Sequence, residues 1–196
     1  RELVESVGPS SGGFELAFDS HGRLFETHNL RHIMHLAIPG RYLAGIPDPR
    51  PLTAIASYSE NGLSRVFPIG EQAPRPNHPE QAGFFSAACG ITAYTGGAFP
   101  DAFSDNVFVA DAVLNLIHRM TIHPDGTGLE ARRGRERVEF LASRDRPFRP
   151  ANMSIGPDGA LYVVDMHRDH IAHPEWIPDA PEAEMDLKAG LAKGCC

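Results

Sequence analysis

Three positions of the sequence carry polar side chains at the same place in a repeated pattern, and these residues could do chemistry together. They are His28, Asp111 and Asp165. Each lies three residues after the aromatic residue of an apolar run, namely Phe25, Phe108 and Tyr162. An imidazole accepts and releases a proton near neutral pH, and carboxylates bind hard cations such as calcium. The pattern therefore predicts one shared site for acid–base or metal chemistry.

Further polar side chains lie close to these positions in the sequence. They are Asn29, Arg31, Asn115, Arg149, Asn152 and Arg168. The side-chain amides of Asn115 and Asn152, together with the two carboxylates, are ligands of the type that a divalent cation prefers. For any single residue we favour a structural role, in which an aspartate caps a turn or an arginine pairs with it. For the set as a whole we favour a site.

The element that must position the last group is a hairpin over residues 148–170, FRPANMSIGPDGALYVVDMHRDH. Its centre, Gly156-Pro157-Asp158-Gly159, has the composition of a tight turn, and the β-branched and aromatic run that follows returns along the first strand. The two outer ends of a hairpin are neighbours at the end away from the turn. Arg149 and Asn152 are therefore expected near Asp165 and Arg168.

The same order of strand, turn and strand occurs in residues 13–35 and 89–120. Three copies of one unit predict a repeat architecture. With 19 glycines, 17 prolines and few helical signals, the chain is expected to be all-β, with its repeats forming blades of a propeller. A β-sandwich is the alternative, but it would not require the same polar motif at the same hairpin end. In a propeller, Phe14, Gly90 and Met153 would belong to innermost strands, and the polar set would face the axis.

Composition and charge exclude several classes of partner. The 196 residues, 42% of them hydrophobic, describe one globular domain or part of a larger one. The formal net charge of −7 argues against nucleic acid or an anionic membrane as the main partner. No apolar run reaches the roughly 20 residues of a membrane span. The three cysteines form no CxxCH motif, so no haem c attachment is predicted, and the start at Arg1 indicates a piece of a longer product.

Four segments of the sequence resemble a known family in the same order. They are FDSHGRLFETHNLRHIMHLAIPGRYL, AACGITAYTGGAFPDAFSDNVFVADAVLNLIHR, RRGRERVEFLASRD and RDRPFRPANMSIGPDGALYVVDMHRDHIAHPEWIP. The resemblance is to quinoprotein dehydrogenase-like propellers of the planctomycete type, commonly labelled membrane-bound dehydrogenase or sorbosone and glucose dehydrogenase-like. It implies about three blades of a six-bladed, soluble quinoprotein dehydrogenase or TolB-like propeller. The expected blades lie around residues 1–75, 76–145 and 146–180, followed by an irregular or short helical tail over 181–196.

The resemblance also implies a reaction, in which a sugar or alcohol hydroxyl is oxidised by hydride transfer to pyrroloquinoline quinone (PQQ) held with calcium. His28 is then the expected catalytic base. Arg149, Asn152, Arg168 and Asn115 are the expected cofactor contacts, and Asp111 and Asp165 the expected metal ligands. Arg149 lies one position away from the family pattern RNPxG, because Phe148 occupies the place of the arginine and Asn152 that of the glycine.

The expected partners are a sugar or other small polyol, the remaining blades, and a cytochrome c domain of the full-length protein. The family resemblance implies an extracytoplasmic location, periplasmic or secreted. Two alternatives stay open from the residues: a non-catalytic propeller that binds a glycan or a protein, and a metal-dependent gluconolactonase-like hydrolase. Metal analysis separates the two, because the hydrolase would hold one divalent cation.

Overall fold

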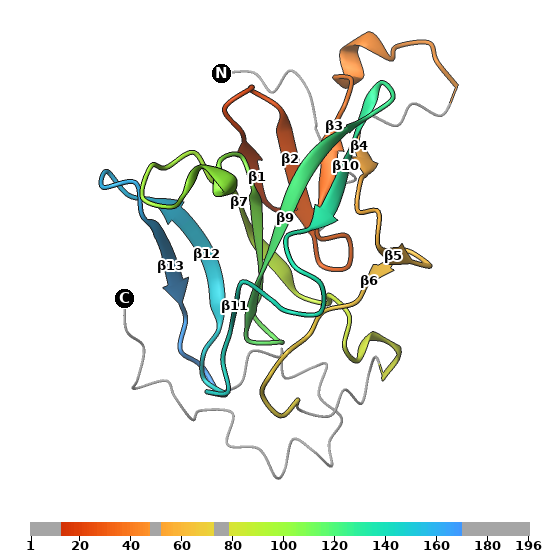
Figure 1. The fold of residues 1–196 in the computed structure, drawn as a ribbon. Helices are drawn as coiled ribbons and strands as arrows, with labels where there is room; N and C mark the ends of the chain where they lie inside the picture. Colours follow the sequence, from red (N-terminus) through yellow and green to blue (C-terminus); the bar gives the residue numbers. More distant parts are fainter. Residues whose placement is uncertain (1–12, 48–51, 73–78, 170–196) are drawn as a thin grey trace, which may run out of the picture.

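The computed structural model describes residues 13–47, 52–72 and 79–169 (Figure 1). Within these residues the chain is all-β, as expected, with thirteen strands and no α-helix. Short 3-10 helices occupy Gly40–Tyr42, Pro79–Gln81 and Asp101–Phe103. In the described part of the chain no helix is long and apolar enough to cross a membrane.

The strands form two large antiparallel sheets and two hairpins. The first sheet has the order β1 (Gly13–Phe18), β2 (Leu24–His28), β3 (Met34–Leu36), β4 (Leu52–Ala54). The second has the order β7 (Ala88–Ala93), β8 (Val107–Asp111), β9 (Leu116–Asp125), β10 (Gly128–Arg133), with β11 (Leu141–Ala142) also paired to β9. The third is the pair β12 (Pro150–Ile155) and β13 (Leu161–Asp165). A small hairpin, β5 (Ser59–Glu60) and β6 (Leu63–Ser64), follows the first sheet.

Two finer predictions from the sequence are wrong. The run Arg65 to Ile69 predicts a short strand, but β6 ends at Ser64 and Arg65 forms only an isolated bridge with Phe84. Residues 46–56 predict a turn of helix, but their described part contains strand β4 instead. Residues 181–192, for which the sequence predicts a short helix, lie outside the described residues.

The first two strands of each sheet pair alike at two positions of the hairpin. The aromatic residue at the second position of the return strand faces the fifth residue of the first strand in every copy: Ala17↔Phe25, Thr92↔Phe108 and Ser154↔Tyr162. The first residue of each hairpin faces the polar residue that ends the return strand: Gly13↔His28, Ala88↔Asp111 and Pro150↔Asp165. The sequence alignment of the three copies is therefore correct at the level of backbone pairing.

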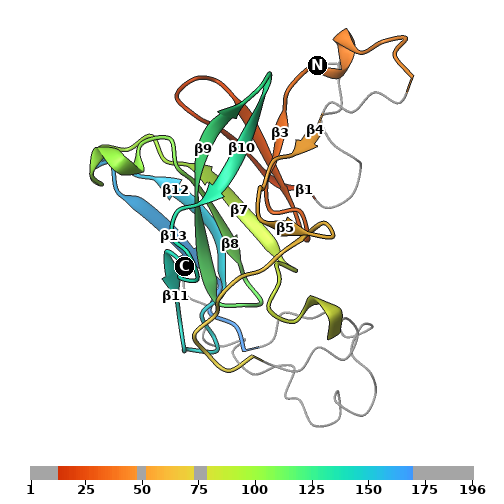
Figure 2. The same cartoon turned by 45° about the vertical axis from the view of Figure 1, so that its right-hand side comes forward.

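The first strands of the three sheets adjoin, which makes the fold that of a partial propeller. Strand β7 packs between β1 on one side and β12 on the other (Figures 1 and 2). Phe14, Gly90 and Met153 lie in these three strands, as predicted. Each sheet thus corresponds to one blade, with its first strand innermost.

The middle sheet is covered on both faces, and β8 shows this directly. Every residue of β8 is buried. Val107 and Val109 belong to the apolar core shared with the first sheet, while Phe108 and Ala110 belong to the core shared with the third sheet. Successive side chains of a strand point to opposite faces, so a strand between two packed layers needs a continuous apolar run. The VFVA run therefore marks an interior blade.

Candidate functional site

Asp111, one of the expected metal ligands, closes the second hairpin at its polar end. The side chain is fully buried. Its Oδ2 accepts hydrogen bonds from the backbone N–H groups of Ser86 and Ala87, at 3.0 and 3.1 Å, just before β7. Its Oδ1 accepts from Val113 and Leu114, both at 3.0 Å, just after β8. Each carboxylate oxygen already has two donors, an arrangement that fixes two loops and does not favour cation binding.

Asp165 repeats this arrangement in the third hairpin. Its Oδ1 accepts from the backbone N–H of Arg149, before β12, at 2.7 Å and from that of His167, after β13, at 2.9 Å. Its Oδ2 lies 3.4 Å from His167 Nδ1. The recurring aspartate therefore accepts hydrogen bonds from the main chain in both hairpins. These bonds join the two open ends of each hairpin.

Arg149 and Asn115 also bind main chain rather than an open cavity. Arg149 is 7% exposed, and its guanidinium donates to the carbonyls of Arg168 at 2.9 Å, Ala112 at 3.0 Å, Val113 at 3.1 Å and Asp169 at 2.9 Å. Burial and the nearby Arg146 lower its pKa, and the carboxylates of Asp169, Asp111 and Asp165 oppose that shift. The side-chain amide of Asn115, which has φ = 58°, donates to the carbonyls of Arg146 and Phe148. Both residues therefore hold the third sheet to the second.

His28 and Arg168 lie at the same end of the sheets. His28 is the last residue of β2, is half-buried, and donates its backbone N–H to the carbonyl of Arg31 at 3.0 Å. Burial raises the pKa of Glu26, two residues earlier, and the nearby His28 partly offsets this shift. Arg168 follows β13 and donates its backbone N–H to Pro147. The catalytic role of His28 and the cofactor role of Arg168 stay predictions.

A different group of residues meets at the inner strands. The third residue of each inner strand is Glu15 in β1, Gly90 in β7 and Asn152 in β12. All three strands show a register shift at or next to this position, and such bulges redirect side chains. The amide of Asn152 donates to Glu15 Oε1 at 2.7 Å, although 137 residues separate the two. We call Glu15 and Asn152 the axial pair.

Gly90 makes room for the axial pair. It has φ = 59°, and a Cβ at this position would lie 2.9 Å from the carbonyl oxygen of Ala151 and 2.9 Å from the Cα of Asn152. Glycine is therefore required both by its backbone conformation and by the close approach of β12 to β7. Strand β7, which lies between β1 and β12, therefore contributes no side chain between Glu15 and Asn152.

Glu15 has one carboxylate oxygen that is not used within the described residues. Oε2 is buried and accepts no hydrogen bond from the described part of the chain. Burial raises the pKa of Glu15, and the hydrogen bond from Asn152 partly offsets this. A buried carboxylate oxygen without a donor is costly, and a hydroxyl or amine of a ligand would satisfy it. Asn152 was predicted as a site residue; Glu15 was missed, because only its equivalence to Gly90 and Asn152 distinguishes it.

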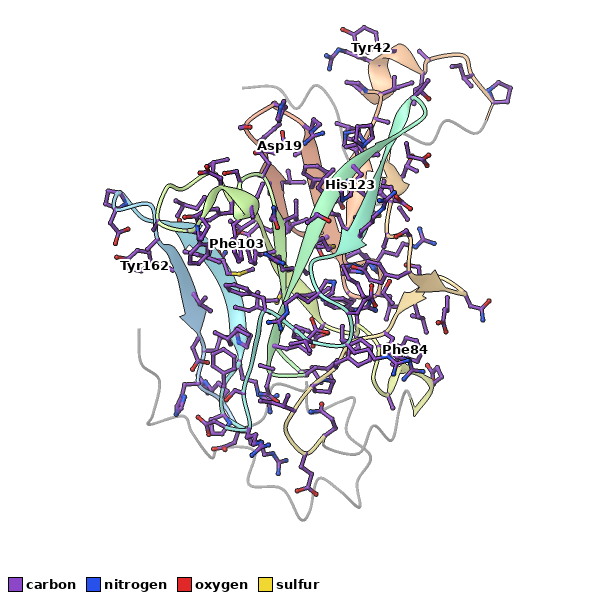
Figure 3. All side chains as sticks on the ribbon, viewed as in Figure 1. Asp19, Tyr42, Phe84, Phe103, His123 and Tyr162 are labelled. Carbon is purple, nitrogen blue, oxygen red and sulfur yellow. The ribbon has the colours of Figure 1, made fainter. Side chains whose placement is uncertain are left out.

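Among the described residues, three side chains that could bind a metal ion lie together at the opposite end of the sheets. Asp19, His21 and Asp105 have ligand atoms within 4.8 Å of one another, near the β1–β2 turn labelled by Asp19 in Figure 3. Existing bonds already use these carboxylates, since Asp19 Oδ2 pairs with Arg23 Nε at 2.5 Å and Asp105 Oδ2 accepts from the hydroxyl of Ser20 at 2.6 Å. Asp19 binds within its own turn, while Ser20 and His21 bind Asp105 and so tie the first sheet to the second.

The four residues named as possible ligands of a divalent cation, among them the expected calcium ligands Asp111 and Asp165, do not converge. Asp111 and Asp165 bind the loops of their own hairpins, Asn115 binds residues 146 and 148, and Asn152 binds Glu15. The arginine expected to contact the quinone carboxylates donates to main-chain carbonyls instead. Arg149, Asn115, Asp111 and Asp165 as arranged here do not fit a site for PQQ and calcium.

Comparisons with known proteins place the chain in a family without assigning a function. A solved structure of a "glucose dehydrogenase" matches at 22% identity over 82% of this chain and 59% of that one, with a TM-score of 0.35. Another, described as "Crystal structure of glucose dehydrogenase", matches at 19% identity over 84% and 63%, with a TM-score of 0.36. The chain thus spans less than two thirds of either protein, and these scores are too low to carry an argument. No curated protein matches. A family model matches residues 2–195, so the chain belongs to the family described as a domain of unknown function, DUF7133.

Proposed function

We propose that this chain supplies about three blades of a sugar dehydrogenase-like propeller, and that the axial pair binds a hydroxyl group of a sugar or another small polyol. One observation carries the proposal. Glu15 has one carboxylate oxygen fixed by Asn152 at 2.7 Å and a second, buried oxygen that accepts nothing within the described residues. A carboxylate beside an amide is well suited to a polyol, because it accepts from hydroxyl groups while the amide can donate to them.

The same pair could take part in oxidation of the bound hydroxyl. Such a reaction removes one proton and one hydride, and a carboxylate of raised pKa is a suitable proton acceptor. The hydride would leave to an acceptor held by residues other than Arg149 and Asn115, whose side chains are committed to main-chain carbonyls. Glu15 thereby becomes a second candidate for the base, beside His28.

A non-catalytic glycan-binding propeller is the second candidate, and a specific observation favours it. Three of the residues expected to serve a cofactor, Arg149, Asn115 and Asp111, form hydrogen bonds that hold loops together. A domain of this kind would bind the polyol through the axial pair without transforming it.

Isothermal titration calorimetry with a panel of aldoses and polyols tests the proposal, with Glu15→Gln as the main variant. Gln keeps an oxygen for the Asn152 amide but replaces the other oxygen by a donor, so binding should weaken about tenfold or more. Glu130→Gln is the control, since Glu130 pairs with Arg132 on the surface. Absence of binding to every polyol, or equal binding by both variants, contradicts the proposal.

Dye reduction separates the two candidates. If polyols bind, the protein is incubated with the polyol and an artificial electron acceptor, with and without added PQQ and calcium, and reduction of the acceptor is followed. Turnover supports the dehydrogenase, and binding without turnover supports the glycan-binding propeller.

A further inference from the structure

A buried chain of four polar side chains crosses from the first sheet to the second, away from the axial pair. His32 Nε2 lies 2.7 Å from the hydroxyl of Tyr58, and this hydroxyl lies 2.8 Å from His118 Nε2. His118 Nδ1 lies 2.5 Å from Glu139 Oε2, and Glu139 Oε1 accepts from the backbone N–H of Phe67 at 2.9 Å. We call these four residues the relay.

The relay joins three separate parts of the fold. His32 follows β2 in the first sheet, and Tyr58 lies in the linker between β4 and β5. His118 belongs to β9, and Glu139 precedes β11. Both of these strands are part of the second sheet. The linker is also paired to β10, because Ala131 donates to the carbonyl of Ile55 at 2.7 Å and Ser57 donates to the carbonyl of Ala131 at 3.0 Å.

Aromatic and charged groups enclose the relay. The rings of His32 and Phe85 stack with centroids 4.3 Å apart, and Phe85 also meets His118 edge-on. Arg133, from β10, places its guanidinium 4.1 Å from the centre of the Tyr58 ring. Glu136, Glu139 and Arg133 are the charged groups that act on Tyr58, and His118 and Arg133 are those that act on His32. His32 and His118 are each 1% exposed, so water does not reach them.

The geometry permits two directions of hydrogen bonding, and each fixes the position of every proton. When His118 is neutral, its Nδ1–H donates to Glu139, so Tyr58 must donate to His118 Nε2 and His32 must donate from Nε2–H to Tyr58. When His118 is charged, its Nε2–H donates to Tyr58, and Tyr58 donates to His32 Nε2. Neutral His32 must then carry its proton on Nδ1.

We propose that the relay is a proton switch that locks the linker of residues 55–67 between the two sheets. It accepts one proton by reversing the direction of its hydrogen bonds, with the charge on His118 beside Glu139. A second proton would put a charge on His32, which is buried next to His118 and Arg133. This charge would release the linker from the two sheets, which we call the open state. Because Ile55 and Ser57 line a groove of about 300 Å³ against Gly128 to Glu130, opening would also widen this groove.

The direction of the acid effect follows from His32. Burial, His118 and Arg133 hold the pKa of His32 well below its usual value of 6.5 in the closed state. In an open state His32 is hydrated and takes up a proton below about pH 6.5. Acid therefore favours the open state progressively as the pH falls from about 6.5 toward the lowered pKa of the closed state.

Nitrogen-15 NMR of the histidine rings in the 196-residue chain tests the switch. In a titration from about pH 8 to about pH 5, His32 should change from the Nε2–H to the Nδ1–H tautomer while still neutral, when the relay takes up its first proton. A network with only a structural role would not couple the tautomer of one ring to the charge of another. A single tautomer of neutral His32 over the whole range would overturn the proposal.

Two variants and their controls test the coupling and the lock. Tyr58→Phe removes the hydroxyl that links the rings, so the His32 tautomer should no longer follow the charge of His118, whereas the exposed Tyr42→Phe should change nothing. His32→Gln keeps an amide donor for Tyr58 but cannot titrate. Acid should therefore lower the protection factors of the Ser57 and Ala131 amides, measured against the intrinsic exchange rate at each pH, about tenfold less than in the unmodified chain. His123→Gln, also on β9, is the control. An acid response in His32→Gln equal to that of the unmodified chain contradicts the lock, and if that variant fails to fold, the tautomer measurement decides.

Discussion

At the scale of residues, the most conspicuous charges of the sequence serve the main chain. Asp111 accepts four backbone N–H groups, and Arg149 donates to four carbonyls, all within a buried region. Such bonds satisfy loop groups that would otherwise be buried without partners. Arg149 should therefore contribute to stability in the absence of any ligand.

Arg149→Lys tests this role. A lysine has three donors at one point and cannot match the planar fork of four bonds, so we expect a loss of about 3 kcal/mol in the free energy of unfolding. Denaturant unfolding of the ligand-free chain measures it. Arg132→Lys, whose side chain is 58% exposed, is the matched control and should change stability by less than about 0.5 kcal/mol. Equal stability of both variants would mean that the Arg149 bonds are not structural.

At the scale of elements, the packing of the inner strands depends on the absence of a side chain at Gly90. Strand β12 approaches β7 at Gly90 so closely that a Cβ would contact the backbone of Ala151 and Asn152 at 2.9 Å. Backbone atoms cannot rotate away as a flexible side chain would, so the strands themselves would have to separate.

Gly90→Ala is expected to cost about 3 kcal/mol of unfolding free energy and to disturb the axial pair. Gly126→Ala is the matched control, because Gly126 has a similar φ of 55° but nothing within 4 Å of its added Cβ. It should cost about 1 kcal/mol, from backbone strain alone. Thermal or denaturant unfolding of both variants gives the comparison. Similar losses would show that the approach of β12 to β7 is not tight.

The hairpins and their pairing could be predicted from the sequence, whereas the site could not. Turn residues such as those at 156–159 and the aromatic at the second position of each return strand are local signals, and they gave the correct register. The repeated aspartates were also correctly aligned, but their repetition reflects hairpin closure. Glu15 meets Asn152, and His32 meets His118, only through packing between sheets. No local periodicity encodes such contacts, which is why neither the pairing of Glu15 with Asn152 nor the relay was predicted.

At the scale of the whole molecule, the two outer sheets leave apolar side chains exposed. On β1, Leu16 is 51% exposed and Phe18 63%; on β13, Tyr162 is 55% exposed and Val164 51%. Tyr162, labelled in Figure 3, donates its hydroxyl to Asp158 Oδ2 in the turn of the same hairpin, at 3.0 Å. These are the faces on which a propeller would place its next blades, and in the described residues no strand pairs with the outer edge of β13.

The chain of residues 1–196 is therefore expected to self-associate in solution. Sedimentation velocity over a range of concentrations should show species larger than a monomer. Replacing Phe18 and Tyr162 by Ser should weaken association at least about tenfold, since each change removes apolar surface from one of the two faces. Tyr42→Ser is the control, because Tyr42 is 67% exposed but lies in a short 3-10 helix away from these two faces. A compact monomer at all concentrations would contradict this expectation.

The separation of Glu15 and Asn152 along the chain also has a consequence for biosynthesis. Contacts within the first two sheets can form as each hairpin leaves the ribosome, but the bond between the axial pair must wait for 137 further residues to be made. If the axial pair binds a polyol as proposed, the nascent chain acquires this binding late, after the third hairpin has docked. A chain interrupted before residue 150 would lack Asn152 and would not bind that ligand.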